Sequence, residues 1–197
     1  MSEWIAEVIT GWGMLGVAFL MFLEHLFPPL PSEVILPLAG IEAARRDLSP
    51  VWMILAGTLG SVAGLSVWFV AALLFGKERL LALVRRFGRI LTVRPEEIGR
   101  LEVWFGRWGD VAVLVGRLIP TVRTLISVPA GFARMPVRTF LIYSTAGSLV
   151  WTAFLILAGV WLGAQGGIIE RWIGPVSDVV LIGIVVTYLY RLVTYRA

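Results

Sequence analysis

Two long stretches of the chain contain no charged residue, and they limit the fold more than any other feature. They occupy residues 51–76 and 139–169. A helix needs roughly 20 residues to cross a hydrocarbon core of about 30 Å. The sequence therefore predicts transmembrane helices over 51–76 and 137–164. A further apolar stretch, which ends in tyrosines and arginines typical of a membrane interface, predicts a C-terminal transmembrane helix over 175–193.

The composition excludes the common soluble classes. Hydrophobic residues make up 58% of the 197 residues and charged residues 15%, against about 45–50% and about 25% in ordinary soluble domains. A soluble enzyme or DNA-binding module of this size would have to expose the surplus to water. The formal net charge of +4 favours contact with anionic membrane lipids over nucleic acid in so apolar a chain. We expect one membrane domain over residues 1–197 and no nucleic-acid partner.

Residues for covalent and metal chemistry are scarce. The chain has no cysteine and a single histidine, His25, and it contains no HExxH motif. Cysteine nucleophiles, cysteine-bound metals and multi-histidine metal sites are therefore excluded. Glu3 and Glu7 stand where a cleavable signal peptide would carry positive charge. We expect no catalytic residue, no metal and no cofactor, and we expect the apolar segments to stay in the mature protein.

Two further apolar segments, residues 11–47 and 110–134, are interrupted by prolines and end in Ala-Gly. Proline removes a backbone donor and breaks a helix. Broken backbone at membrane depth is tolerated only where protein buries it or where it lines a wet cavity. We therefore expect two re-entrant hairpins. The residues expected at the breaks are Pro28, Pro31, Gly40, Pro120, Pro129 and Gly131.

The linker at 77–109 has a different character. Apolar residues recur at helical spacing opposite arginines, and the segment holds Lys77 and seven arginines. This pattern is typical of amphipathic helices that lie on an anionic leaflet, with a solvated linker as the alternative. The positive-inside rule places the linker and the C-terminus in the cytoplasm. The Arg45-Arg46 pair then faces outward.

The order of features occurs twice. A short helix, a proline break, Ala-Gly and a long apolar helix follow one another in 11–76 (repeat 1) and in 110–164 (repeat 2). Each repeat enters and leaves one side through its hairpin and then crosses once, so consecutive repeats must have opposite orientations. An inverted repeat with paired interrupted segments is typical of a transporter. Matched positions include Trp12-Gly13 with Trp108-Gly109, and Thr58-x-Gly60-Ser61 with Thr145-x-Gly147-Ser148.

Four ionisable residues fall in the broken segments. Glu24 and Glu33 lie in the first, and Arg117 and Arg123 lie in the second. A charge at the bilayer centre costs roughly 3 kcal/mol, so these residues must pair with one another or face water. One interpretation is a static cluster of ion pairs. The other is a site where the arginines bind a lipid phosphate and the carboxylates take up protons. His25 either joins this relay or is a hydrogen-bonded interface residue.

Both broken segments carry family signatures. Residues 24–40 (EHLFPPLPSEVILPLAG) and 116–131 (GRLIPTVRTLISVPAG), the latter continuing through Arg134, resemble the two signatures of the DedA family, also called the SNARE-associated or VTT-domain family. The likeness extends over roughly residues 11–165. It implies an inner-membrane protein with two facing re-entrant hairpins. Glu33 is a departure, because this position is often Asp in the family.

The resemblance also implies a function. Family members are associated with lipid movement between leaflets, driven by the proton motive force, and the family's essential residues map onto Glu24, Glu33, Arg117 and Arg123, with Arg134 as an accessory. We therefore expect a translocase of a phosphate-bearing lipid, most simply undecaprenyl phosphate, in the bacterial cytoplasmic membrane. A phosphatidylethanolamine or general phospholipid translocase or scramblase, a proton-coupled small-ion transporter, a scaffold and an intramembrane enzyme are the alternatives. The sequence leaves the lipid and a homo-oligomeric state open.

Overall fold

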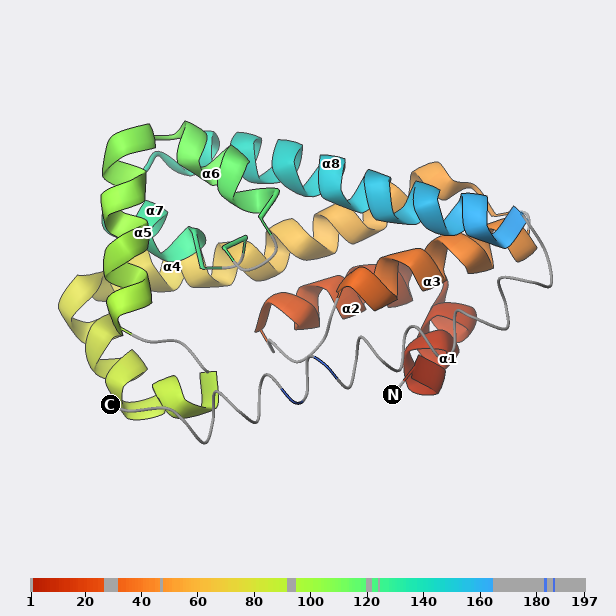
Figure 1. Ribbon diagram of the computed structural model, residues 1–197, viewed down its shortest axis with the longest axis horizontal. Helices are drawn as coiled ribbons and strands as arrows, with labels where there is room; N and C mark the ends of the chain where they lie inside the picture. Colours follow the sequence, from red (N-terminus) through yellow and green to blue (C-terminus); the bar gives the residue numbers. More distant parts are fainter. Residues whose placement is uncertain are drawn as a thin grey trace. The chain divides into compact units, whose positions relative to one another are not determined.

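The computed structural model describes residues 2–26, 32–46, 48–91, 95–119, 122–123 and 125–164, together with 183 and 186. Within these ranges the chain forms eight helices and no strand (Figure 1), which confirms the all-helical class. The predicted helix over 175–193 lies almost wholly outside the described residues, as do Pro28, Pro31 and Pro120. The helices are α1 (Ser2–Trp12), α2 (Met14–Leu26), α3 (Ser32–Arg45), α4 (Pro50–Leu91), α5 (Pro95–Trp108), α6 (Val111–Arg117), α7 (Ser127–Phe132) and α8 (Val137–Ala164).

The two uncharged stretches form the two longest apolar helices, as predicted. α4 begins at Pro50, in the first helical position, where the missing N–H of proline costs nothing. Its dihedral angles leave the helical region at Gly76 (φ 70, ψ 172), where the uncharged part ends. The segment before this kink has 27 residues and α8 has 28, so each is about 40 Å long and exceeds the hydrocarbon thickness.

Large apolar side chains on both long helices face away from the protein core. Leu59 and Leu74 of α4 are 69% and 72% exposed, and Ile142 and Phe154 of α8 are 67% and 64% exposed. In water such surfaces would favour aggregation. Hydrocarbon surroundings remove that cost, so these faces suit lipid contact.

The chain divides into two compact units. Unit 1 comprises residues 1–61 and 149–187, and unit 2 comprises 62–148 and 188–197. Each unit therefore holds one series of short helices and one part of each long helix. The two units do not coincide with the two predicted repeats, because α4 and α8 are each divided between them.

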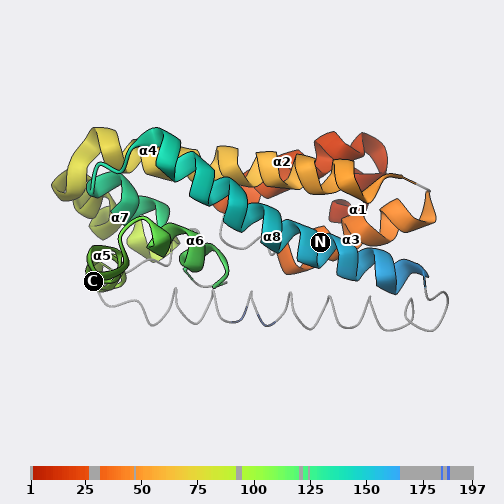
Figure 2. The ribbon, with the colours of Figure 1, turned by 90° about the horizontal axis from the view of Figure 1, so that it is seen from above.

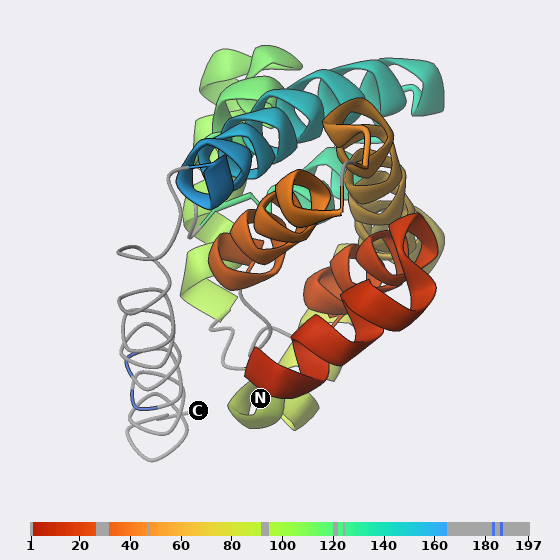
Figure 3. The ribbon, with the colours of Figure 1, turned by 90° about the vertical axis from the view of Figure 1, so that its right-hand side faces the viewer.

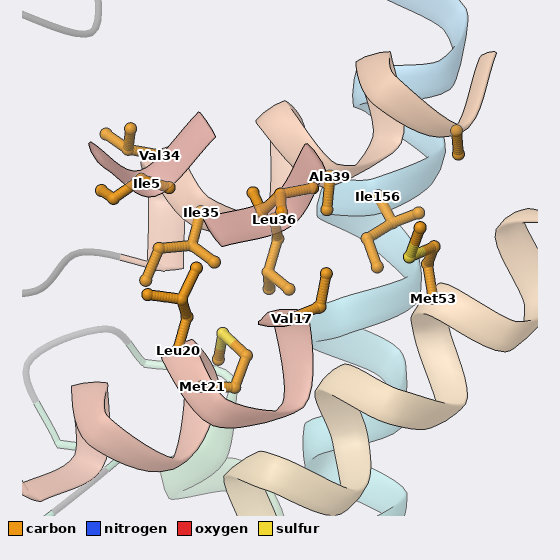
Figure 4. Close-up of a cluster of buried hydrophobic side chains, with 12 residues drawn as sticks. Ile5, Val17, Leu20, Met21, Val34, Ile35, Leu36, Ala39, Met53 and Ile156 are labelled. Carbon is orange, nitrogen blue, oxygen red and sulfur yellow. The ribbon is translucent and has the colours of Figure 1, made fainter. Parts of the chain in front are cut away.

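Unit 1 has an apolar core to which α1, α2, α3, α4 and α8 contribute (Figure 4). Leu20 of α2 and Leu36 of α3 are fully buried in it, together with Met53 of α4 and Ile156 of α8. At about 25 cal/mol per Å² of apolar surface removed from contact with water, such a core would be the main stabilising term in water. In a bilayer close van der Waals packing takes over this role.

Helix α3 lies beside α8 within unit 1 (Figure 3), and Gly40 lies at their contact. A Cβ atom at Gly40 would collide with backbone atoms of one turn of α8, so only glycine allows this approach. Small residues at close helix crossings are typical of membrane proteins. The contacted residues of α8 are Ile156, Gly159 and Val160.

Gly131 makes the corresponding contact in unit 2, where it brings α7 against α4. A Cβ atom at Gly131 would lie 2.6 Å from the carbonyl oxygen of Phe69. Gly40 and Gly131 both belong to the Ala-Gly pairs that end the broken segments. The contacted residues of α4 are Phe69, Ala72 and Leu73, which precede their counterparts in α8 by the interval that separates Gly60 from Gly147.

The core of unit 2 is built around an aromatic pair that joins α4 and α8. Figure 2 shows these two long helices from above. The rings of Phe69 and Phe140 are stacked, with centroids 4.0 Å apart and an interplanar angle of 13°. Phe105 of α5 packs into the same core, whereas Val103 and Arg107 on other faces of α5 are exposed. α5 is therefore amphipathic, as the sequence predicts for this part of the linker.

Candidate functional site

Arg117 is among the largest fully buried side chains of the described residues. It is the last residue of α6, and it is only 2% exposed. Buried arginine is rare in proteins unless its charge is compensated by partners. The neighbours of Arg117 in unit 2 are therefore the starting point for the site.

The guanidinium of Arg117 donates to three neutral oxygen atoms. Nη1 donates to the backbone carbonyl of Arg123. Nη2 donates to the hydroxyl of Ser127 at 3.1 Å and to the hydroxyl of Ser144 at 2.9 Å. The buried Nε has no hydrogen-bond partner. All of these acceptors lie within unit 2, on the segment before α7, on α7 and on α8.

Two residues close the site around Arg117. The centre of the guanidinium lies 5.5 Å from the ring centroid of Phe140, within the range of a cation–π contact. Gly147 of α8 lies against the stem of the side chain, where a Cβ atom would come within 2.6 Å of Cβ of Arg117. One face of α8 therefore surrounds Arg117 with the ring of Phe140, the hydroxyl of Ser144 and the backbone of Gly147.

Arg123 lies on the segment between α6 and α7 and is 7% exposed. Its backbone N–H donates to the carbonyl of Ile119 at 3.0 Å, and the N–H of Ile126 donates to the carbonyl of Val122 at 2.9 Å. With its carbonyl held by Arg117, Arg123 sits in a tight turn. The structure thus brings the two predicted arginines together, and the backbone of one is bonded to the side chain of the other.

Unit 1 contains a buried acid and histidine on α2. Glu24 is 6% and His25 is 4% exposed. Nδ1 of His25 lies 2.7 Å from Oε2 of Glu24 and 2.9 Å from the carbonyl oxygen of Met21. Glu24 and His25 thus form a buried pair of polar side chains inside an apolar unit.

Glu33 is the second residue of α3 and is partly buried. The hydroxyl of Ser32 lies 3.5 Å from its Oε2, and the indole N–H of Trp151 on α8 donates to the same hydroxyl at 3.4 Å. A carboxylate in the first turn of a helix is favoured by the positive end of the helix dipole. Glu33 is thus connected to α8 through one serine.

The remaining predicted residues have plainer positions. Arg134 is exposed in the turn after α7 and has a left-handed backbone with φ 52. Pro129 is the third residue of α7, where no intrahelical donor is required of it. Gly40 and Gly131 lie inside helices rather than at breaks, so their observed role is close helix contact.

The sequence analysis missed the residues that surround Arg117. Ser127, Phe140 and Ser144 were not predicted as site residues. The signal for Ser144 was a hydroxyl in an uncharged membrane-length helix, which must find a partner inside the protein. Among the described residues, no group of three or more His, Cys, Asp or Glu side chains could hold a metal ion.

Two membrane-length apolar helices, exposed apolar faces and buried ionisable groups fit a helical membrane protein. The VTT domain family matches residues 30–161, and the chain belongs to this family. The resemblance to the DedA (VTT-domain) family is thereby confirmed, and the chain is a bacterial membrane protein.

The relatives that are named for an activity include two different kinds. A Lactococcus lactis protein called alkaline phosphatase-like protein is 40% identical over 92% of this chain and 86% of its own length. Undecaprenyl phosphate transporter A of Staphylococcus aureus is 31% identical over 99% of this chain and 96% of its own length. Its namesake in Bacillus subtilis is 27% identical over 100% and 97%. No solved structure matches the chain.

Proposed function

We propose that the chain translocates a phosphate-bearing lipid across the bacterial cytoplasmic membrane, with undecaprenyl phosphate as the first candidate. The observation that carries this proposal is the buried pair Arg117 and Arg123 in a protein with membrane-length apolar helices. Ionisable residues inside membrane segments mark substrate or ion pathways, and the planar guanidinium of arginine suits the oxygens of a phosphate. Full-length relatives named for undecaprenyl phosphate transport support the choice of lipid.

The proposed division of roles follows the two units. Arg117 and Arg123 of unit 2 form the phosphate-binding site. Glu24 and Glu33 of unit 1 take up and release protons, with His25 as an accessory, because carboxyl groups in apolar surroundings are costly to leave charged. Transport is thereby linked to the proton motive force. Arg134, which is exposed, is an accessory cation near the end of the second signature.

The proposed architecture is an inverted repeat of two re-entrant hairpins. The described helices support it, since α1 to α4 and α5 to α8 run in the same order. Gly13 and Gly109, each after a tryptophan, join the first two helices of each series with φ values of 56 and 57. The matched contacts of Gly40 and Gly131 also support it. In the proposed orientation the linker and the C-terminus are cytoplasmic, and α5 lies on anionic lipid.

A vesicle assay tests the proposal. The purified chain is reconstituted into liposomes that contain a fluorescent polyprenyl phosphate in both leaflets, and a membrane-impermeant quencher is added outside. We expect the quenched fraction to rise beyond the outer-leaflet share with the native chain and not with Arg123→Gln. Arg107→Gln is the matched control, because it removes the same charge from an exposed position on α5.

The same vesicles separate the alternatives. Phosphatidylethanolamine and other phospholipids carrying the same fluorophore test for general scrambling, and a pH-sensitive dye inside the vesicles tests for ion flux without lipid movement. Because two Lactococcus relatives are named alkaline phosphatase-like protein, phosphatase activity is the alternative function to test. We expect no release of inorganic phosphate from the polyprenyl phosphate. A native chain that moves none of these lipids would contradict the proposed function.

A further inference from the structure

We propose that Arg117 is a positioning residue, which shapes the segment before α7 so that Arg123 alone contacts the lipid phosphate. This inference rests on the proposed function, because it assigns different roles to two arginines of one phosphate site. Four observations support it. They are the hydrogen bonds of the Arg117 guanidinium, the burial of its Nε, the positions of its three acceptors, and the residue of α4 that corresponds to Ser144 of α8.

The hydrogens of Arg117 are committed to protein acceptors. A guanidinium grips an anion through two parallel N–H groups, and every such pair includes a hydrogen on Nη2. Both Nη2 hydrogens point to serine hydroxyls, Ser127 and Ser144, and Nη1 donates to the carbonyl of Arg123. No edge of the guanidinium is therefore open for a two-point contact with phosphate.

The remaining donor cannot reach a ligand either. Nε of Arg117 is enclosed by protein and has no acceptor. Phe140 covers the guanidinium, and Gly147 lies against its stem. A lipid headgroup would have to displace this packing to touch Arg117.

The three acceptors tie together parts of the chain that are distant in sequence. Ser127 is the first residue of α7, Ser144 lies on α8, and the third acceptor is the backbone of Arg123 itself. One side chain at the end of α6 thus fixes the segment that carries Arg123 and the start of the next helix. Without this side chain, the turn before α7 would lose its hydrogen bonds, and Arg123 would no longer be held in one position.

The other unit shows that the serine at α8 is not required by the fold. Gly57 precedes Thr58 in α4 as Ser144 precedes Thr145 in α8. A Cβ atom at Gly57 would meet methyl groups of Thr152, Leu36 and Val17, so this place in unit 1 is lined by methyl groups and holds no arginine. A polar socket is present where an arginine fills it, and its hydroxyls therefore serve Arg117.

A double-mutant cycle tests whether Arg117 acts through Arg123. The affinity of the full chain in mixed micelles for a short polyprenyl phosphate is measured for Arg117→Gln, Arg123→Gln and the double variant. We expect Arg117→Gln to weaken binding in the native background and to have no further effect when Arg123 is absent. If the double variant instead loses affinity by the product of the two single losses, as expected for two direct contacts, the inference is overturned.

The serines give milder variants in case Arg117→Gln does not fold. Ser127→Ala and Ser144→Ala each remove one acceptor and should weaken phosphate binding roughly tenfold, the usual effect of a lost hydrogen bond to a charged group. Ser66→Ala is the matched control, because the hydroxyl of Ser66 bonds only to the carbonyl of Val62 in its own helix. Equal affinities for Ser144→Ala and Ser66→Ala would count against the positioning role.

A second measurement needs no lipid. The chain has no cysteine, so Ile119→Cys places a single thiol at a partly exposed position beside the arginine segment. We expect its rate of reaction with a maleimide to change when Ser144→Ala or Arg117→Gln is added and to stay constant with Ser66→Ala. If the native chain binds no polyprenyl phosphate, the proposed function fails, and this rate alone decides the positioning role: a constant rate overturns it.

Discussion

Gly147 of α8 lies directly against the aliphatic stem of Arg117. A Cβ atom at this glycine would come within 2.6 Å of Cβ and 2.9 Å of Cγ of the arginine. Distances of this kind are too short for real carbon atoms, so the absence of a side chain on α8 sets how closely α6 can approach. The position of the buried cation therefore depends on a residue that carries no functional group.

Gly147→Ala should displace Arg117 and weaken phosphate binding without removing any charge. Overpacking a well-packed site costs about 1–3 kcal/mol, so a fall in Tm of several degrees should accompany the loss of affinity. Gly106→Ala on α5 is the control, because nothing lies within 4 Å of a Cβ atom there. Thermal unfolding and lipid binding of the two variants check the prediction, and identical behaviour would refute it.

Gly40 and Gly131 should tolerate alanine poorly for the same physical reason in the two units. Each lies against the backbone of a long helix, which cannot move aside as a flexible side chain can. We expect Gly40→Ala and Gly131→Ala to lower Tm by similar amounts. Gly11→Ala, at an open position in α1, should leave Tm unchanged or raise it, because alanine favours the helix. A fall in only one of the two variants would argue against equivalent contacts.

Glu24→Gln should uncouple transport from an imposed proton gradient. The change keeps the shape of the side chain but removes the carboxylate that faces His25 at 2.7 Å. The rate of lipid movement in vesicles, measured with and without a pH gradient, should respond in the native chain and stay flat in the variant. Glu42→Gln is the control, since Glu42 pairs with Arg45 and Arg46 at an exposed end of α3. A gradient response that survives in Glu24→Gln would exclude Glu24 as the coupling group.

The orientation can be checked with single cysteines. Arg100→Cys on α5 and Leu48→Cys after α3 are both at exposed positions. We expect a membrane-impermeant maleimide to label Leu48→Cys in intact cells and Arg100→Cys only after the membrane is opened, because the basic linker should be cytoplasmic. Labelling in the reverse pattern would invert the proposed topology, and labelling of both in intact cells would contradict it.

The main helices could be predicted because their causes are local in the sequence. An uncharged segment of membrane length must form a helix in a bilayer, because a helix satisfies its backbone hydrogen bonds internally. Prolines at positions 50 and 95 mark the starts of α4 and α5. The four candidate site residues stand out in the sequence for a related reason, although their functional roles stay predictions. Charges such as Glu24 and Arg117 are costly inside apolar segments, so their presence there indicates a role.

The partners of those residues could not be predicted. The hydrogen bond from Arg117 to Ser144 joins residues 27 positions apart, and a serine in an apolar helix has nothing in its own neighbourhood to indicate an arginine. The contact of Gly40 with α8 also escaped prediction. Gly40 contacts α8 and Gly131 contacts α4, so each contacts the long helix of the other series.

This exchange of long helices has a consequence for any half-length version of the chain. A fragment that ends after α4 would contain α3 without the turn of α8 that Gly40 contacts, and a fragment that begins at α5 would contain α7 without its turn of α4. Neither fragment can complete its own packing. Two halves expressed together should restore each other's packing, because each supplies the long helix that the other half lacks.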